Sequence, residues 1–366
     1  MKRINAIISF ILSGILLTSC AVQGKWEQSN QSYSPTAAIE KQEHHTDTIP
    51  DNSTFEVHYI DVGQADSSII LCDGHSMLID GGNVADSNLI AAYLKKEDIS
   101  VLDYLVCTHA HEDHVGGLSG ALSVTKVKNV LAPYTEADTK AYQNFKNKSA
   151  AQGLEIQHPS AGDSFTLGSS DVQIIGPITE HADNLNNTSI VMKLTYGNTS
   201  FLFTGDAERN EEQDIINAGY DVSADVLKVG HHGSDNSTSY VWLREVMPQY
   251  AVISVGKDNS YGHPTEAVLS RLRDADVQLY RTDLQGDIIA VSDGNKISIT
   301  TAKNENIQTN ETAAETTENG YIGNRNSKKF HRPDCRTLPS DKNRVSFSSR
   351  EAAINSGYSP CGNCNP

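Results

Sequence analysis

The chain has no apolar run long enough to cross a lipid bilayer. The run from Ile7 to Leu17 is shorter than the roughly 20 residues that a membrane helix needs, and no other segment comes closer. Because Lys2 and Arg3 precede it, this run has the pattern of a secretory signal peptide. We therefore predict that residues 1–20 are a signal segment and take no part in the fold.

The segment Leu17-Thr18-Ser19-Cys20 resembles a bacterial lipobox. The resemblance implies cleavage before Cys20 and a lipid on its sulfur. The protein would then be extracytoplasmic and anchored to a bacterial membrane through that lipid. The alternatives are an ordinary signal peptide with an incidental cysteine, or an uncleaved anchor.

Positive charge is also scarce, with 29 Lys and Arg against 46 Asp and Glu and a net charge of −17. Residues 321–366 hold eight Lys or Arg against three acids, a balance of +5, so residues 1–320 carry −22. This acidity argues against passive electrostatic capture of nucleic acid by the larger part. The basic C-terminal segment is the better candidate for holding a polyanion, although surface solubility is the simpler explanation of its charge.

Two polar stretches divide the 366 residues. Residues 21–53 are rich in Gln, Ser, Thr, Asn and His, and bury too little apolar surface to offset the entropy of ordering. We predict a flexible tether there and, on similar composition, a linker at residues 302–320. A large domain at residues 54–301 and a small one at residues 321–366 remain.

The large segment begins with strand-like runs and then alternates strands with helices. The expected strands are Phe55–Val62, Ser67–Cys72, Met77–Ile79, Tyr104–Cys107, Ser200–Thr204, Ala224–Val229, Tyr250–Val255 and Val277–Tyr280, and the expected helices are Glu208–Ala218, Tyr240–Val246 and Thr265–Asp274. This order predicts an α+β fold in which two sheets pack face to face with helices outside. Cys72 and Cys107 fall in apolar strands and are expected to be small core residues.

The most informative stretch is Thr108–Gly117, which follows the apolar run Leu102–Cys107. Three imidazoles and an aspartate, at His109, His111, Asp113 and His114, fall within six residues on the loop where that strand ends. Imidazole and carboxylate are the natural ligands of zinc and manganese, and so dense a cluster is costly unless cations order it. A lone histidine would be an ordinary surface or core residue, but this spacing indicates a metal site.

The pattern HxHxDH followed by Gly-Gly resembles the metallo-β-lactamase superfamily of binuclear metallohydrolases. Further stretches, in the same order along the chain, resemble the ComEC-like hydrolase domains of DNA-uptake proteins. These stretches are residues 59–67, 78–82, 186–191, 203–208, 227–234, 261–264 and 280–283. The likeness covers about residues 54 to 300 and implies an αβ/βα sandwich whose ligands lie on loops at one sheet edge. ComEC-like proteins carry this domain on a membrane channel that the chain lacks, so a part in DNA transport does not follow.

The resemblance also implies a ligand set for two divalent metal ions, zinc or manganese. His109 and His111 would hold the first metal, Asp113 and His114 the second, and the Asp206 carboxylate would bridge both. The second metal needs one more imidazole, for which His231 is the first choice and His232 the near rival.

The chain departs from many superfamily members at the third ligand of the first metal. It has Asn186-Asn187 where many members have a histidine, as ComEC-like domains do. Because Asn suits harder ions or a metal-bound water better than zinc, the first site is expected to be weak, open or suited to manganese, with Asn187 near metal or substrate. His181 lies close by in the chain and is a substitute ligand, or simply a solvated loop residue.

The remaining candidates act beside the metals. Asp80, before a Gly-Gly turn, is expected to orient a ligand histidine. Asp113 belongs to the catalytic set as well as the metal set, and His263 is expected to contact a substrate phosphate or protonate a leaving group. Two cations would lower the pKa of a shared water and stabilise the charge that develops on a phosphodiester.

The last 46 residues contain a second set of potential ligands. His331 and Cys335 form a His-x3-Cys pair, and Cys361 and Cys364 form a Cys-x2-Cys pair. Both spacings suit a closed structural zinc site, which so short a segment needs in order to fold. Residues 321–366 resemble the metal-binding domain of Ada-type DNA-repair proteins, with His331 in place of the first cysteine. A disulfide is the alternative, but three cysteines would leave one unpaired and His331 unexplained.

We therefore predict an extracytoplasmic, lipid-anchored two-metal hydrolase that cleaves DNA phosphodiesters. A phosphodiesterase of the cell envelope, similar to phosphorylcholine esterases, is the alternative enzyme. A β-lactamase or lactonase fits less well because Asn187 replaces the usual histidine. A lipoprotein that binds DNA without turnover is the non-catalytic alternative.

Overall fold

The computed structural model describes residues 50, 52–179, 183–310, 321–333, 335–347, 350–364 and 366. The expected signal segment with Cys20, and the candidate ligand His181, lie outside the described residues. Within the described ranges, no helix combines the length and the hydrophobicity that a membrane span requires.

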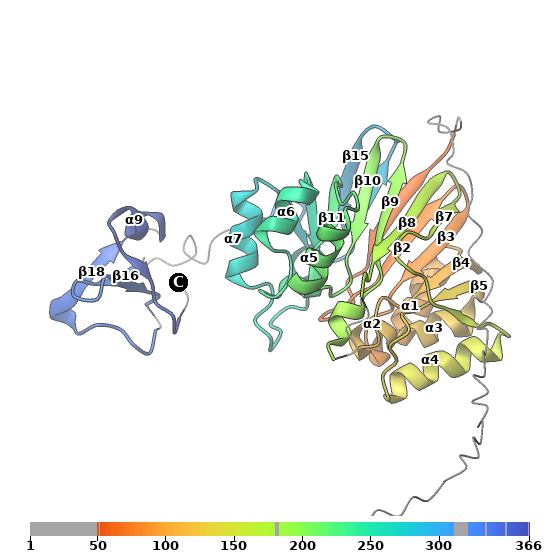
Figure 1. Cartoon of the computed structure of the whole chain (residues 1–366), viewed down its shortest axis with the longest axis horizontal. Helices are drawn as coiled ribbons and strands as arrows, with labels where there is room; N and C mark the ends of the chain where they lie inside the picture. Colours follow the sequence, from red (N-terminus) through yellow and green to blue (C-terminus); the bar gives the residue numbers. More distant parts are fainter. Residues whose placement is uncertain are drawn as a thin grey trace, which may run out of the picture. The chain divides into compact units, whose positions relative to one another are not determined.

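The large part is built on two mixed sheets that face each other (Figure 1). The first sheet has the strand order β15-β14-β1-β2-β3-β4-β5-β6, and the second has the order β13-β12-β11-β10-β9-β8-β7. The strands of the first sheet are β1 (Phe55–Tyr59), β2 (Ser68–Cys72), β3 (His75–Ile79), β4 (Val101–Val106), β5 (Lys126–Leu131), β6 (Ile156–Gln157), β14 (Ile288–Ser292) and β15 (Ile297–Thr301). Those of the second are β7 (Ser164–Leu167), β8 (Ser170–Gly176), β9 (Val191–Tyr196), β10 (Thr199–Phe203), β11 (Val226–Lys228), β12 (Tyr250–Ile253) and β13 (Gln278–Arg281).

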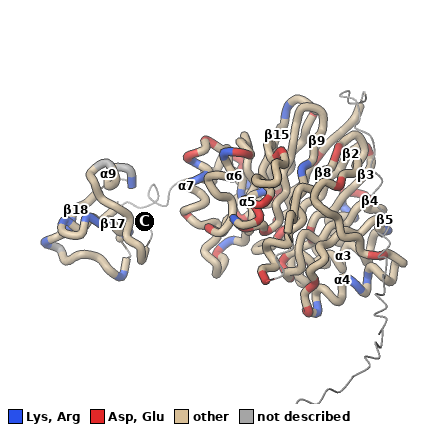
Figure 2. The backbone as a smooth tube through the Cα atoms, viewed as in Figure 1, with Lys and Arg blue, Asp and Glu red and all other residues tan. Residues whose placement is uncertain are grey.

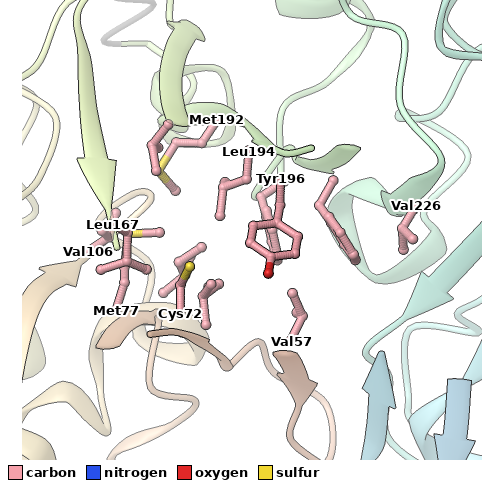
Figure 3. Close-up of a cluster of buried hydrophobic side chains, with 14 of the residues drawn as sticks. Val57, Cys72, Met77, Val106, Leu167, Met192, Leu194, Tyr196 and Val226 are labelled. Carbon is pink, nitrogen blue, oxygen red and sulfur yellow. The ribbon is translucent and has the colours of Figure 1, made fainter. Parts of the chain in front are cut away.

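The main core fills the space between the two sheets. Alternate residues of β1, such as Phe55 and Tyr59, point inward because successive side chains of a strand face opposite sides. Their rings meet those of β10, with centroids 5.0 Å apart for Phe55 and Phe201 and 6.0 Å apart for Tyr59 and Phe203. Figure 3 shows further contributions from both sheets, including the thiol of Cys72.

Helices cover the outer face of each sheet and bury two further cores. The first sheet is covered by α1 (Ser87–Lys96), α3 (Leu118–Val124) and α4 (Lys140–Ala151), and the second by α5 (Arg209–Ala218), α6 (Tyr240–Val246) and α7 (Glu266–Asp274). The four layers form the predicted αβ/βα sandwich, so the predicted fold class is confirmed. The short helical segments are η1 (Val84–Asp86), α2 (Glu112–Val115), η2 (Leu185–Thr188), η3 (Gly230–Gly233) and α8 (Thr282–Gln285).

Helix α7 starts one residue later than the sequence pattern predicts. Thr265 has extended backbone angles, and its side chain accepts a hydrogen bond from the Val268 amide. It therefore caps the helix instead of forming its first turn. Ser239 caps α6 in the same way through the Trp242 amide, and α6 has the predicted bounds.

Parallel pairing brings the ends of distant strands to one edge of the sandwich. Strands β3, β4 and β5 are parallel neighbours in the first sheet, and β10, β11, β12 and β13 are parallel neighbours in the second. Because parallel strands end at the same edge, the loops that follow β4, β10, β11 and β12 come together there.

Residues 302–310, which the sequence analysis places in a linker, are hydrogen-bonded to the large part. The Ala302 amide donates to the Asp287 carbonyl at 2.8 Å, and the Thr309 hydroxyl donates to the Leu279 carbonyl. A run of polar side chains predicts a linker. Such side chains do not prevent backbone amides of the segment from donating hydrogen bonds to carbonyl groups of the large part.

The small part is a sheet of the order β18-β16-β17-β19 with one helix. Its elements are β16 (Tyr321–Asn324), β17 (Lys329–His331), η4 (Asp341–Asn343), β18 (Arg344–Phe347), α9 (Arg350–Asn355) and β19 (Ser359–Pro360). Among its described residues, the buried hydrophobic cluster consists of Tyr321, Phe330, Ala353 and Tyr358. So small a core needs an additional constraint to hold the fold.

Candidate metal centre

The candidate ligands lie on the loops that meet at one edge of the sandwich. His109, His111 and α2 follow β4, Asp206 follows β10, and the His231-His232 pair follows β11. The structure thus brings together residues that are up to 123 positions apart in the chain.

The loop after β4 packs against the Asp80-Gly81-Gly82 turn. The Gly81 amide donates to the His114 carbonyl at 2.8 Å. A Cβ atom on Gly117 would lie 1.8 Å from the Gly81 carbonyl oxygen, and one on Gly116 would lie 2.3 Å from the Val84 amide nitrogen. Gly116 and Gly117 must therefore be glycines, because the backbone there lies so close to the backbone of residues 81–84. This close contact fixes the position of α2.

Asp206 lies at the centre of the cluster. Its carboxylate oxygens lie 3.3 Å from His114 Nε2 and 3.8 Å from His109 Nε2. The same carboxylate lies 3.7 Å from His231 Nε2 and 3.8 Å from His232 Nε2. Four imidazoles from two loops therefore surround one carboxylate that is only 2 % exposed.

A group with the arrangement of a metal site forms around that carboxylate. Asp66, His114, Asp206 and His232 are all buried, and each offers a ligand atom within 4.8 Å of the others. His232 Nε2 also lies 3.3 Å from the Asp113 carboxylate. His114 Nε2, His232 Nε2 and Asp206 Oδ1 are buried without a hydrogen-bond partner. Because buried polar atoms are nearly always satisfied, this donor set fits divalent cations.

Hydrogen bonds fix which ring nitrogen faces the cluster. His114 Nδ1 lies 2.8 Å from Asp80 Oδ2, and the same carboxylate accepts the Thr108 amide at 2.8 Å and the Thr108 hydroxyl at 2.7 Å. His232 Nδ1 bonds to the Ser254 carbonyl at 3.0 Å. Both rings therefore present Nε2 to the cluster, and Asp80 lies where a residue that orients a ligand histidine must lie.

Burial and neighbouring charges set the protonation of the cluster. Burial alone would raise the pKa of Asp206, but the imidazoles of His114 and His232 hold it well below its usual range. Burial would lower the pKa of His114, but the Asp206 and Asp80 carboxylates raise it well above its usual value. The pKa of His109 is lowered, first by burial and then by the neighbouring His114. The carboxylate at the centre is thus kept ionised, as a metal ligand must be.

The two adjacent histidines after β11 play different parts in this geometry. Both have left-handed backbone angles, with φ of 51° at His231 and 52° at His232. His232 is buried in the cluster, whereas the side chain of His231 is 22 % exposed and its Nδ1 lies 3.5 Å from Glu208 Oε1. Left-handed non-glycine residues are strained, and such strain is concentrated at functional sites.

Asn187 is buried, but its side-chain oxygen is already engaged. Asn187 Oδ1 accepts a hydrogen bond from the Glu208 amide at 2.9 Å. Its neighbour Asn186 donates to the Glu208 carboxylate at 2.9 Å. The asparagine pair therefore shapes the loop around Glu208.

An open cavity of about 270 Å³ lies over the cluster. It is lined by Gln64, His111, Glu112, Asp113, Asp206, His231, His232, Tyr261 and His263. His263 Nδ1 is buried without a hydrogen-bond partner, and burial together with the nearby His231 and His232 lowers the pKa of His263 to about 4. His263 is therefore a neutral imidazole at physiological pH, within reach of a bound substrate.

A buried lysine, Lys228, is the residue that sequence reasoning missed, and it pairs with Asp66. Lys228 Nζ lies 2.8 and 2.9 Å from the two oxygens of Asp66, and both residues are less than 5 % exposed. The only signal in the sequence was a lysine among the apolar residues of β11. Because Asp66 belongs to the metal-type cluster, Lys228 balances part of its negative charge.

The small part holds a second metal-type group. His331, Cys335, Cys361 and Cys364 each offer a ligand atom within 4.8 Å of the others, and His331 Nε2 is buried without a hydrogen-bond partner. The described cysteines are all free thiols. One imidazole and three thiols at this spacing match the chemistry of a structural zinc site.

Comparison with known protein families matches residues 60–257 to the metallo-beta-lactamase superfamily. The chain belongs to this superfamily. A second match assigns residues 305–366 to the metal binding domain of Ada. The predicted resemblance and cofactors are thereby confirmed: a metal-dependent hydrolase with a His/Asp site for two metal ions and a zinc site near its C-terminus.

The sequence relatives include a ComE operon protein and a competence protein, both bacterial. The chain is 31% identical over 255 residues to ComE operon protein 3 of Bacillus subtilis (strain 168) and 31% identical over 244 residues to competence protein ComA of Neisseria gonorrhoeae. These alignments cover 65% and 66% of this chain but only 33% and 32% of the two relatives, so the chain spans about a third of their length. Among solved structures, the metallo-beta-lactamase fold protein YhfI from Bacillus subtilis aligns with a TM-score of 0.44 at 12% identity, over 67% of this chain and all of that one.

Replacing Lys228 with methionine is expected to lower the free energy of unfolding of the metal-free protein by about 3–5 kcal/mol, because Asp66 would stay buried without its partner. Urea denaturation measures this change. Lys128→Met is the matched control, since Lys128 pairs with Asp103 at 2.6 Å on the surface, where such pairs contribute about 0–1 kcal/mol. Equal losses in the two variants would contradict a special role for the buried pair.

Proposed function

We propose that this hydrolase is a metal-dependent phosphodiesterase whose substrate is DNA. The observation that carries the proposal is the set of buried, unpartnered ligand atoms beneath an open cavity, in a chain whose relatives include one named as a competence protein. An open cavity over two cations suits a substrate that carries its negative charge on non-bridging oxygens.

We assign the ligands from their burial and distances. His109 and His111, which lie 3.0 Å apart between Nε2 and Nδ1, would hold the first metal, and Asp206 would bridge to the second. Asp113, His114 and His232 would complete the ligand set of the second metal. The unpartnered Nε2 of His232 lies close to both Asp113 and Asp206. This assignment prefers His232 to His231, which the sequence analysis placed first.

The protein side chains then act on a phosphodiester in separate ways. Cations held by these residues would supply an acidified water and would neutralise charge on the phosphate oxygens. Asp80 holds the ring of His114, and the Ser254 carbonyl holds that of His232, so neither ligand has to reorganise during the reaction. His263 faces the same cavity as a neutral imidazole and can form a hydrogen bond with an oxygen of the substrate phosphate.

We further propose that the enzyme is anchored outside the cytoplasm by a lipid on Cys20. The proposal rests on the short apolar run from Ile7 to Leu17 and on the lipobox-like segment that ends at Cys20. An enzyme in that position would meet DNA from the surroundings of the cell.

The purified protein is expected to cleave plasmid DNA, single-stranded DNA and bis-p-nitrophenyl phosphate when supplied with Mn²⁺ or Zn²⁺. His111→Ala and Asp206→Ala should reduce turnover to background while circular dichroism shows a retained fold, because each removes a metal ligand from a rigid scaffold. Wild-type rates in either variant would refute the site. Cleavage of the small ester without DNA would favour an envelope phosphodiesterase, and DNA retention without ester turnover would favour a binding protein.

His232→Ala is expected to lose about one of the two bound metal equivalents, whereas His231→Ala should keep both, because His232, unlike His231, offers a buried, unpartnered nitrogen to Asp113 and Asp206. Elemental analysis of the dialysed proteins provides the measurement. His75→Ala is the control, since His75 lies on the surface beside Asp103. The opposite result for the two variants would restore His231 as the ligand.

Deleting residues 321–366 is expected to weaken DNA binding more than it slows turnover of bis-p-nitrophenyl phosphate. This segment holds eight Lys or Arg, some of which show as blue stretches near β17 and β18 in Figure 2, while the rest of the chain carries −22. Binding of a labelled oligonucleotide at several salt concentrations measures the first effect. If the DNA affinity and its salt dependence are unchanged by the deletion, residues 321–366 are not part of the DNA-binding surface.

A further inference from the structure

The loop between β12 and α7 forms one wall of the cavity and is held in a single shape by Asn259. Asn259 Nδ2 donates to the carbonyls of Gly256 at 2.9 Å and His263 at 2.6 Å. Asn259 Oδ1 accepts the amides of Tyr261 at 3.1 Å and His263 at 3.0 Å. Four hydrogen bonds from one side chain therefore close the loop before any ligand arrives.

The other end of the loop is fixed to the first sheet's side of the cavity. The Gly256 amide donates to Gln64 Oε1 at 3.1 Å. A Cβ atom on Gly256 would lie 2.6 Å from the Gln64 amide nitrogen, so only glycine allows this approach. The loop is thus positioned rigidly beside the metal cluster.

This rigid loop presents an aromatic ring to solvent at the cavity. Tyr261 is 71 % exposed, although it lines the same cavity as His111, Asp206 and His263. Its ring is stacked on that of His263, with centroids 5.7 Å apart and an angle of 27° between the planes. His263 in turn packs edge-on against His231, with centroids 5.7 Å apart. His263, which His231 supports, covers one side of the Tyr261 ring. The rest of the Tyr261 ring is exposed and can contact a planar ligand.

We propose that Tyr261 and His263 form a stacking subsite for an unpaired nucleobase next to the phosphodiester that is cleaved. The proposal rests on the proposed function and adds to it the class of substrate, a nucleotide whose base is free to leave its neighbours. Bases stack on aromatic side chains in proteins that bind single strands, because every base has a π-face. A base inside a duplex is already stacked on both faces and cannot use the ring.

A quaternary ammonium group is the competing ligand for an exposed aromatic ring. Recognition of such cations normally uses a cage of several aromatic rings. Among the described residues that line this cavity, Tyr261 is the single Tyr, Phe or Trp. One ring supported by an imidazole forms a flat platform, which suits a base better than it suits a cation.

The structure offers a matched control in a second exposed tyrosine that is also stacked on a histidine. Tyr134 is 64 % exposed, and its ring lies 4.5 Å from that of His158 at an angle of 25°. Neither residue lines the cavity over the metal cluster. Tyr134→Ala therefore removes the same kind of stack from a place that substrate does not reach.

The test compares two esters with the same leaving group in the full-length, Mn²⁺-loaded protein. One is thymidine 5′-(p-nitrophenyl phosphate), which carries a base, and the other is methyl p-nitrophenyl phosphate, which does not. In Tyr261→Ala, the ratio of kcat/KM for the thymidine ester to that for the methyl ester should fall roughly 5- to 150-fold, the factor expected for one lost base stack. Tyr261→Phe and Tyr134→Ala should keep the wild-type ratio.

The outcomes separate the subsite from the proposed function. An unchanged ratio in Tyr261→Ala would overturn the subsite while leaving the phosphodiesterase intact. A wild-type preference for p-nitrophenyl phosphorylcholine that Tyr261→Ala abolishes would show a cation site instead. If the wild type hydrolyses none of these esters, the proposed function fails, and calorimetry with thymidine 5′-monophosphate tests the subsite by itself. Equal affinities in the wild type and Tyr261→Ala would overturn the subsite. A weaker affinity in Tyr261→Ala would support it.

Discussion

Removing a carboxylate from water is costly unless positive charge or hydrogen bonds replace the lost hydration. Asp206 is 2 % exposed, and four imidazoles lie within 3.8 Å of its oxygens, yet Oδ1 has no hydrogen-bond partner. The rest of the site follows from this constraint. The loops after β4 and β11 must bring their histidines to the end of β10, and only the shared edge of the two sheets allows this.

Sequence patterns and the family resemblance were sufficient for the fold and for naming most of the candidate ligands. The residue pattern predicted α6 with its observed bounds and α7 to within one residue, because burial acts over a few positions. His109, His111, Asp113 and His114 could be found together because one loop and one short helix carry all four. So compact a pattern indicates a metal site without any knowledge of the residues that pack around it.

Long-range packing decided the remainder, for which the local sequence carried little signal. His231 and His232 are neighbours in the chain, and two left-handed residues in succession determine which ring enters the cluster. Lys228 and Asp66 are 162 positions apart, so their pairing depends on how the sheets are stacked. The exposed ring of Tyr261 gains significance only from the cavity beside it, because a tyrosine in a polar loop is otherwise unremarkable.

The segment after the last strand of the large part also affects how the molecule behaves among copies of itself. Strands β13 and β15 are the terminal strands of their sheets, and free strand edges invite pairing between chains. Residues 305–310 lie beside both strands across a cavity of about 450 Å³, with Thr309 bonded to Leu279 of β13. This segment therefore occupies space beside two strand edges, which leaves less room there for a strand of another chain.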